Sequence, residues 1–187
     1  LKEVKQNSRK EVFDFIVKEL QESAPLLAQT YSNRSGSYYG RITRPVVHFL
    51  LAKLVLNAEI YADDNWTDTQ HPDGRDIYFE VDGNRLNAWQ TVEAYCDSIT
   101  AAGYRLEDNY EANFAVYNES SAENIFTIPM SKTLYTNQMQ YLFRSRHYNH
   151  AKAYGLGGEN GSSATVEVLR TFGYDTQTVD PRFDKCY

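Results

Sequence analysis

The segment YYGRITRPVVHFLLAKLVLNAEIY, residues 38–61, predicts a helix that is apolar on almost every side. From Pro45 to Tyr61 only four residues are not apolar: His48, Lys53, Asn57 and Glu59. The apolar run is shorter than the roughly 20 residues that span a bilayer. On a helical wheel the four polar residues form two narrow edges, which leave two broad apolar faces. The segment therefore predicts a buried helix from about Thr43 to Tyr61, with a neighbouring helix against each face.

A second helix is expected before this segment. Ser8 stands three residues before Glu11, which is the spacing of a capping box, and Pro25 marks the end of the helix. Between them apolar residues recur at helical intervals: Val12, Phe13, Ile16, Leu20 and Ala24. The central helix has start signals of its own, because Thr43 suits the N-cap and Pro45 falls within the first turn.

A third helix is expected to begin near residue 85 and to end at Gly103, a typical C-terminal stop. One face of this helix carries Ala88, Trp89, Val92, Cys96 and Ile99. Tyr104 follows the stop and is expected to pack on the helix end. The three helix starts are roughly 35 to 41 residues apart, near the period of tetratricopeptide-type hairpins, although any antiparallel bundle can show this spacing.

The connections contain shorter elements. Residues 62–84 are acidic and rich in turn dipeptides, and DIYFEV within them predicts a short strand. A further short strand is expected at residues 125–130, and a helix from about Ser162 or Ser163 to Gly173.

Residues 133–162 concentrate Tyr, Asn, Arg and His and show little periodicity. A long polar-aromatic loop region of this kind is usually there to bind something. We therefore expect a mainly α protein in which residues 1–103 form a helical part. Residues 104–187 form a loop-rich part that carries the candidate ligand face.

Composition narrows the function. The chain has 187 residues, and 25 acidic against 19 basic side chains give a formal charge of −6, which argues against nucleic-acid or anionic-membrane partners. The 15 tyrosines suit a surface that contacts ligands. Cys96 and Cys186 lie far apart and form no zinc pattern, so we expect free or buried thiols. The chain opens at Leu1 without a leader, and we expect an internal piece of a longer protein.

No metal site or cofactor is predicted. The acidic loop at 62–84 lacks the spacing of an EF-hand, so it is expected to be solvated. His147 and His150 have a spacing that can bind a metal on a helix. However, no third ligand is evident, and the charges of Arg144 and Arg146 would oppose a cation.

Several motifs, in this order, resemble the SusD/RagB family of surface glycan-binding lipoproteins. The resemblance covers nearly the whole chain. The motifs that carry it are FDFIVKEL (13–20), the opening segment with its Tyr-Gly-Arg-x-Thr and Leu-Asn-Ala-Glu-x-Tyr, AAGYRLEDNYEANFAVYNESSAENIF (101–126), YGLGGENGSSAT (154–165) and DPRFDK (180–185).

The resemblance implies a SusD-like fold, with tetratricopeptide-like helical hairpins, long irregular loops and short strands. It implies a non-catalytic protein, surface-exposed at the outer membrane, that binds oligosaccharides or polysaccharides and delivers them to a SusC-like TonB-dependent transporter for nutrient uptake. The family is held to the membrane by a lipidated cysteine. On this resemblance the anchor lies outside the chain and is neither Cys96 nor Cys186.

Six residues are candidates for glycan contact, because sugars present an apolar ring face to aromatic side chains and a hydroxyl rim to polar ones. The resemblance implies that Tyr141 is a stacking residue. It also implies a Trp after Asn160-Gly161, where this chain has Ser162 instead, and this puts starch itself in doubt. The other candidates come from side-chain chemistry alone: Trp66, Arg144, His147, Tyr148 and Asn149.

Two alternatives stay open. A glycoside hydrolase needs a pair of carboxylates, and Glu119, Glu123 or the loop aspartates are available for it. A helical-repeat scaffold would instead bind a protein partner and no glycan.

Overall fold

The computed structural model describes residues 5–130, 148–153, 155, 157–158, 164–176 and 178–183. Contacts divide the chain into two compact units, Leu1–Ile128 and Pro129–Tyr187. Residues 104–128, which the sequence groups with the loop-rich part, thus belong to the first unit. The described elements are mainly helices, as predicted, together with a two-stranded sheet.

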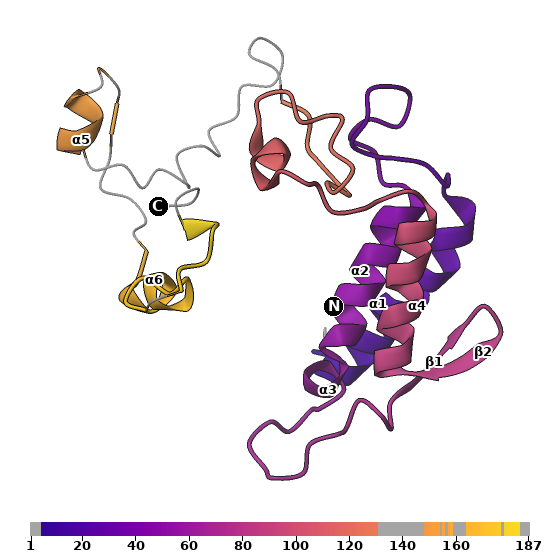
Figure 1. Cartoon of the computed structure of the whole chain (residues 1–187). Helices are drawn as coiled ribbons and strands as arrows, with labels where there is room; N and C mark the ends of the chain where they lie inside the picture. Colours follow the sequence, from indigo (N-terminus) through magenta and orange to yellow (C-terminus); the bar gives the residue numbers. More distant parts are fainter. Residues whose placement is uncertain are drawn as a thin grey trace. The chain divides into compact units, whose positions relative to one another are not determined.

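Three helices form the body of the first unit: α1 (Arg9–Ser23), α2 (Arg44–Leu56) and α4 (Ala88–Ala101). α2 packs against both α1 and α4, so its two apolar faces each have a helical neighbour, as predicted. The end of α1, which continues as the short 3₁₀ helix η1 (Ala24–Leu26), lies beside the start of α2. α2 therefore runs antiparallel to α1, and Figure 1 shows that it also runs antiparallel to α4.

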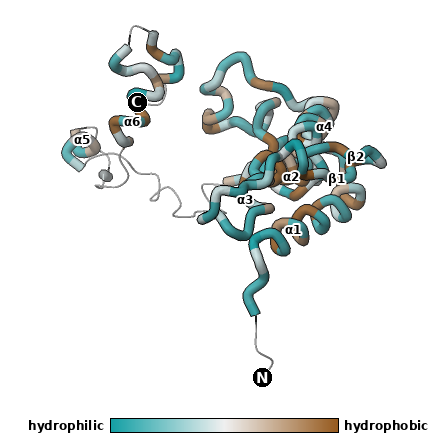
Figure 2. Tube along the Cα trace, turned by 90° about the horizontal axis from the view of Figure 1, so that it is seen from below, coloured by the Kyte–Doolittle hydropathy of each residue, from teal (hydrophilic) through white to brown (hydrophobic). Residues whose placement is uncertain are grey.

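The core lies where the three helices meet. Leu51 and Val55 of α2 are completely buried. The buried cluster around them comprises Phe13, Val17, Ala24, Val47, Leu51, Ala52, Val55, Ala58, Ala88 and Tyr95. Figure 2 shows hydrophobic residues alternating with hydrophilic ones along α1, as expected of a helix with one buried face.

The central helix is shorter than predicted. It stops at Leu56, and a separate turn, α3 (Ala58–Tyr61), follows. Asn57 between them leaves helical geometry (φ −108°, ψ 22°), and its side-chain amide donates to the carbonyl of Lys53 at 2.9 Å. Asn interrupts the helix because its side chain competes for backbone partners.

Thr43 occupies the N-cap of α2, but its side chain does not cap the helix. Its hydroxyl is buried without a hydrogen-bond partner in the described part of the chain. The reason is Pro45, which has no N–H to offer, while the N–H of Val46 donates to the Thr43 carbonyl at 3.0 Å. The expected side-chain cap is therefore wrong, although Pro45 lies in the first turn as predicted.

The other two helix starts use side-chain caps. Ser8 and Glu11 form the predicted capping box: the Ser8 hydroxyl accepts the Glu11 N–H at 3.2 Å and Glu11 accepts the Ser8 N–H at 2.9 Å. α4 begins later than predicted, because Asn87 and Gln90 form a second capping box.

Residues before that cap belong to a strand instead of a helix. β1 (Tyr78–Val81) pairs antiparallel with β2 (Asn84–Asn87), with Tyr78 opposite Asn87. Asp82 and Gly83 both have positive φ (49° and 78°), the geometry of a two-residue hairpin turn. The strand predicted within DIYFEV is confirmed over YFEV (78–81), whereas the helix start near residue 85 is wrong, since α4 begins at Ala88.

Two further expectations in this unit are corrected. Residues 125–130 form no strand, and the chain is irregular there after the 3₁₀ helix η2 (Tyr110–Phe114). Cys96 is a free thiol, as expected, but it is exposed and does not lie on the buried face of α4, which consists of Ala88, Thr91, Tyr95 and Ile99. Tyr104 is buried at the helix end as predicted, and its hydroxyl accepts the Ser32 N–H at 3.3 Å.

The second unit contains two short described helices, α5 (Tyr148–Ala153) and α6 (Val166–Thr171). α6 begins a few residues later than predicted, because the Thr165 side chain caps it by accepting the Val168 N–H at 3.4 Å. Gly173 follows with φ +80°, the left-handed geometry expected of a C-terminal stop.

Two leucines on α2 test the packing directly. Leu51→Ala removes a fully buried side chain, so we expect it to lower the free energy of unfolding by about 2–5 kcal/mol. Leu56→Ala is the matched control, since Leu56 is 56% exposed and its loss should cost less than about 0.5 kcal/mol. Urea unfolding followed by circular dichroism measures both, and equal effects would contradict the assignment of Leu51 to the core.

Candidate functional site

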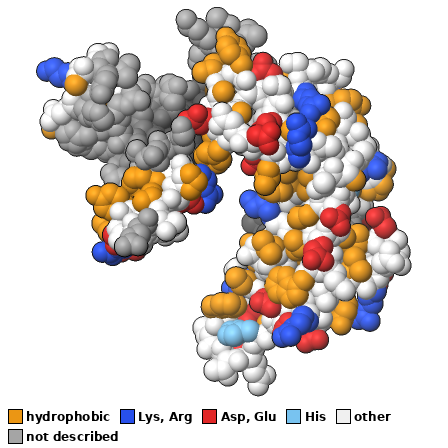
Figure 3. Space-filling model, viewed as in Figure 1, with side chains coloured by type: hydrophobic (Ala, Val, Ile, Leu, Met, Phe, Trp, Pro, Cys, Tyr) orange, Lys and Arg blue, Asp and Glu red, His pale blue; other side chains and the backbone are white. Residues whose placement is uncertain are grey.

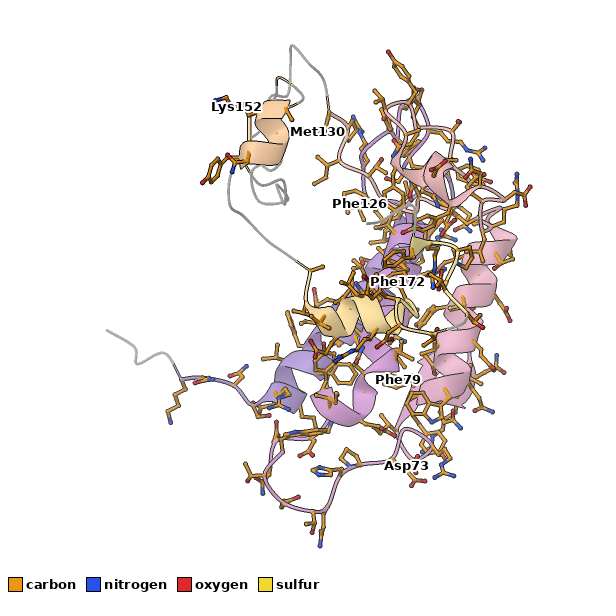
Figure 4. All side chains as sticks on the ribbon, turned by 60° about the vertical axis from the view of Figure 1, so that its left-hand side comes forward. Asp73, Phe79, Phe126, Met130, Lys152 and Phe172 are labelled. Carbon is orange, nitrogen blue, oxygen red and sulfur yellow. The ribbon has the colours of Figure 1, made fainter. Side chains whose placement is uncertain are left out.

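The acidic loop between α3 and β1, residues 62–77, is held at both ends, and near its start Asp64 Oδ1 accepts the Lys10 N–H at 2.9 Å. At its return, the Gly74 N–H donates to Glu59 Oε1 at 2.8 Å, and the Gly74 carbonyl accepts the Ala88 N–H at 3.0 Å. Asp73 beside it forms an ion pair with Arg75 (2.6 Å), which lowers the pKa of Asp73 to about 2. Figure 4 shows Asp73 on this loop, at the end of the helices away from Phe126.

Gly74 also sits directly against an aromatic ring. A Cβ at this position would lie 2.4 Å from Cζ2 of Trp89, a distance that real contacts do not allow. Trp89 is partly buried and packs against the core. Close approach of the loop to α4 therefore requires a residue without a side chain at position 74.

The outer part of the loop is organised by one buried carboxylate. Asp63 is buried; its Oδ1 accepts the Asn65 N–H at 2.8 Å, and its Oδ2 accepts Nδ1–H of His71 at 2.7 Å. The hydrogen bond from His71 is the main reason that the pKa of Asp63 is lowered, and it outweighs the opposing effect of burial. Asp63 thus stays ionised at neutral pH and fixes the orientation of the His71 ring.

Trp66 lies on that ring. The two ring centroids are 4.7 Å apart and the planes are tilted by 35°, while the Trp66 side chain remains 51% exposed. We call Trp66, His71 and Asp63 together the Trp66 platform. An exposed indole backed by a fixed imidazole offers an apolar surface at a small cost in side-chain entropy.

Polar side chains surround the Trp66 platform. Asn65 Nδ2 donates to Asp68 Oδ2 at 2.6 Å, and the Thr67 hydroxyl donates to Asn65 Oδ1 at 2.7 Å. Asp68 Oδ1 accepts the Gln70 N–H at 2.9 Å. The result is an aromatic face next to amide, hydroxyl and carboxylate groups, an arrangement that can bind a ligand with an apolar face and a hydroxyl rim.

Of the six predicted site residues, Trp66 is the one whose contacts and exposure are described in most detail. Tyr148 and Asn149 are exposed at the start of α5, in the other unit. Tyr141, Arg144 and His147 lie outside the described residues. Within the described part, therefore, the six candidates are not brought together in one site.

Sequence reasoning missed the two residues that hold Trp66 in place. Asp63 and His71 lie on either side of it in the chain, but no motif marks them as partners. The available signal was weak: an acidic residue and a histidine near an exposed tryptophan in a turn-rich segment. Among the described residues there is no group of three or more side chains that could hold a metal ion.

Glu123, one of the carboxylates considered for hydrolysis, has a structural role. Its Oε2 accepts the Glu107 N–H at 3.0 Å and Asn113 Nδ2 at 2.7 Å, and these bonds lower its pKa. A general acid in a glycoside hydrolase needs a raised pKa instead. The environment of Glu123 therefore does not suit that role.

Three comparisons were made, with protein-family models, with curated proteins and with solved structures, and none of them finds a match for this chain. In the parts of the chain that the structure describes, no helix has both the length and the apolar character to span a membrane.

Gly74→Ala tests the attachment of the loop. The added Cβ clashes with the Trp89 ring, so we expect a loss of about 1–3 kcal/mol in the free energy of unfolding. Gly83→Asn is the control, because position 83 is in open space and Asn tolerates its positive φ. Thermal melts compare the two variants, and a Gly74→Ala protein as stable as the parent would show that the loop does not pack closely on α4.

Acid titration tests the Trp66 platform. Because the folded-state pKa of Asp63 lies below its usual 3.8, its contribution to stability is present above pH 3.8 and is lost as pH falls through the lowered value. We expect the indole N–H resonance of Trp66 to move in this range, and Asp63→Asn to remove that step. A Trp66 resonance that follows only the global unfolding seen by circular dichroism would contradict this role of Asp63.

Proposed function

We propose that this protein is a non-catalytic glycan-binding protein of the SusD/RagB type. In this proposal it binds oligosaccharides or polysaccharides at the outer surface of a bacterium and delivers them to a SusC-like TonB-dependent transporter. The protein would be a surface lipoprotein whose anchor lies outside the present chain. The α1–α2 and α2–α4 hairpins are compatible with the tetratricopeptide-like hairpins of that family, and the order of the sequence motifs supports the assignment.

The observation that carries the proposal is the Trp66 platform. A sugar ring can stack on the exposed indole while its hydroxyls reach polar side chains around it. His71, fixed by Asp63, keeps the indole in place before a ligand arrives. Preorganisation of this kind favours binding because little freedom is lost when the ligand arrives.

Replacing Trp66 by Ala should weaken glycan retention by about 1–3 kcal/mol, with base–aromatic stacking as the analogue. Phe114→Ala is the matched control, since Phe114 is also an exposed aromatic residue of the first unit but lies outside the Trp66 platform. Affinity electrophoresis against a panel of polysaccharides measures retention, and a thermal melt verifies folding. Equal retention by the parent and Trp66→Ala would refute the role of Trp66, and retention of no polysaccharide by the parent would refute glycan binding.

A second candidate function, a helical scaffold for a protein partner, has one observation in its favour. An apolar groove of about 810 Å³ lies along α2 and α4. Its exposed hydrophobic residues include Ile42, Phe49, Leu50, Leu106 and Phe126. Figure 3 shows hydrophobic side chains, in orange, at the surface in several places on one face of the molecule. This function predicts no glycan retention, so the same assay separates the two.

A further inference from the structure

A second, polar pocket lies on the first unit, apart from the acidic loop. It encloses about 450 Å³ between the end of α1, the first turns of α2, the last turns of α4 and the β1–β2 hairpin. Its accessible apolar wall is formed by Val81, Pro25 and Ala101, and Leu51 borders it but is completely buried. Several polar side chains also line the pocket, and their groups are only partly satisfied by one another.

Arg44 forms a fixed part of that wall. Its guanidinium donates to the carbonyls of Ala24 and Pro25, both at 3.0 Å, and of Leu27 at 3.2 Å. These carbonyls lie at the end of the first helical segment, where, among the described residues, only that of Ala24 also accepts a backbone N–H, from Leu27 at 3.2 Å. These bonds use Nε–H and Nη2, so Arg44 is fixed in position and supplies the pocket with its charge and with its Nη1–H donors.

His48 supplies a hydrogen-bond donor. Its ring packs on Tyr95 with centroids 5.5 Å apart, and its Nδ1 is buried without a partner among the described residues. Burial lowers the pKa of His48, and the charge of Arg44 adds to this while Asp82 opposes it. The ring is therefore neutral at pH 7, and its proton belongs on Nε2 because a proton on Nδ1 would find no acceptor.

Tyr95 supplies a second donor. Its hydroxyl oxygen accepts Nε2–H of Gln21 at 3.0 Å, and Gln21 also donates to the Glu80 carbonyl at 2.9 Å. Burial raises the pKa of Tyr95, so the hydroxyl keeps its proton. That proton has no acceptor in the described part of the protein, which leaves it available to a ligand.

The hairpin supplies acceptors. Glu80 and Asp82 both line the pocket and are exposed. Two carboxylates against one guanidinium disfavour an anionic ligand. A metal ion is disfavoured as well, because Arg44 opposes it and the described residues contain no group of three metal-binding side chains.

We propose that this pocket binds a single neutral sugar residue, as a glycan subsite separate from the Trp66 platform. Each hydroxyl of a sugar both donates and accepts, which matches a wall with donors at His48 and Tyr95 and acceptors at Glu80 and Asp82. The apolar wall at Val81, Pro25 and Ala101 suits the C–H face of the ring. The inference rests on the proposed function, since it takes the ligand class from there.

The test is a titration of the ¹⁵N-labelled chain with glucose, galactose, mannose and N-acetylglucosamine, each alone at millimolar concentration. We expect at least one sugar to shift the backbone resonances of Tyr95, Ser98 and Asp82. His48→Phe keeps the aromatic contact but removes one donor, so the same sugar should bind about 3- to 10-fold more weakly. Ala101→Trp, at an exposed position that lines the pocket, should abolish the shifts by filling the space.

Asp82→Asn is a further variant, chosen because it should change the pocket without unfolding the protein. Asn tolerates the positive φ of position 82, so the hairpin turn is kept while the charge is removed. We expect weaker binding with an unchanged thermal melt. The indole resonance of Trp66 serves as an internal comparison in every titration.

The outcomes are distinct. Shifts at Tyr95 and Ser98 that Ala101→Trp abolishes support the pocket, whether or not Trp66 also responds. Shifts at Trp66 alone overturn the pocket but leave glycan binding standing. If neither site responds to any sugar, while polysaccharide is still retained in electrophoresis, the pocket is refuted and the proposed function survives through other residues.

Discussion

The burial of α2 on two sides is the constraint on which the first unit depends. Leu51 and Val55 have no exposed surface, and this is possible only because α1 covers one face of the helix and α4 covers another. The three helices alternate in direction, because α1 and α4 both run antiparallel to α2. Arg44 strengthens the arrangement at one end by satisfying carbonyls at the end of the first helical segment. Both candidate ligand sites are attached to this frame, the Trp66 platform through Gly74 and the polar pocket through His48 and Tyr95.

The two sites relate to the frame in different ways. The Trp66 platform stands on a loop that touches the helices at its ends, and its internal geometry comes from its own hydrogen bonds, above all those of Asp63. The polar pocket lies between three helices and the β1–β2 hairpin, so the packing of these elements on one another sets its shape. A loop site can adapt to a ligand, whereas a site between packed helices selects for one that fits.

Periodicity and capping residues predicted much of the fold. Ser8 and Glu11 marked the start of α1, and the two apolar faces of α2 predicted its neighbours, because such patterns are local or follow directly from burial. The predicted helix bounds were wrong where an Asn side chain forms a local hydrogen bond. Asn57 ends α2 before the predicted end, and Asn87 caps α4 after the predicted start, so that the residues before it belong to a strand. The candidate site was less predictable. Trp66 could be picked out by its chemistry, but its partnership with His71 and Asp63 depends on the folded loop, and no spacing in the sequence encodes it.

In the β1–β2 hairpin, residues that pack on the core alternate with residues that are exposed at the polar pocket. Phe79 and Val81 pack against the core, while Glu80 between them and Asp82 in the turn are exposed at the mouth of the polar pocket. Substitution of Glu80, or replacement of Asp82 by a residue that tolerates its positive φ, therefore changes the charge at the pocket without disturbing what the hairpin buries. The opposite wall has no such freedom, because Arg44 and Tyr95 also hold the helices together. The hairpin is thus the part of the unit where the charge that faces the pocket can change, while the helical wall stays constant.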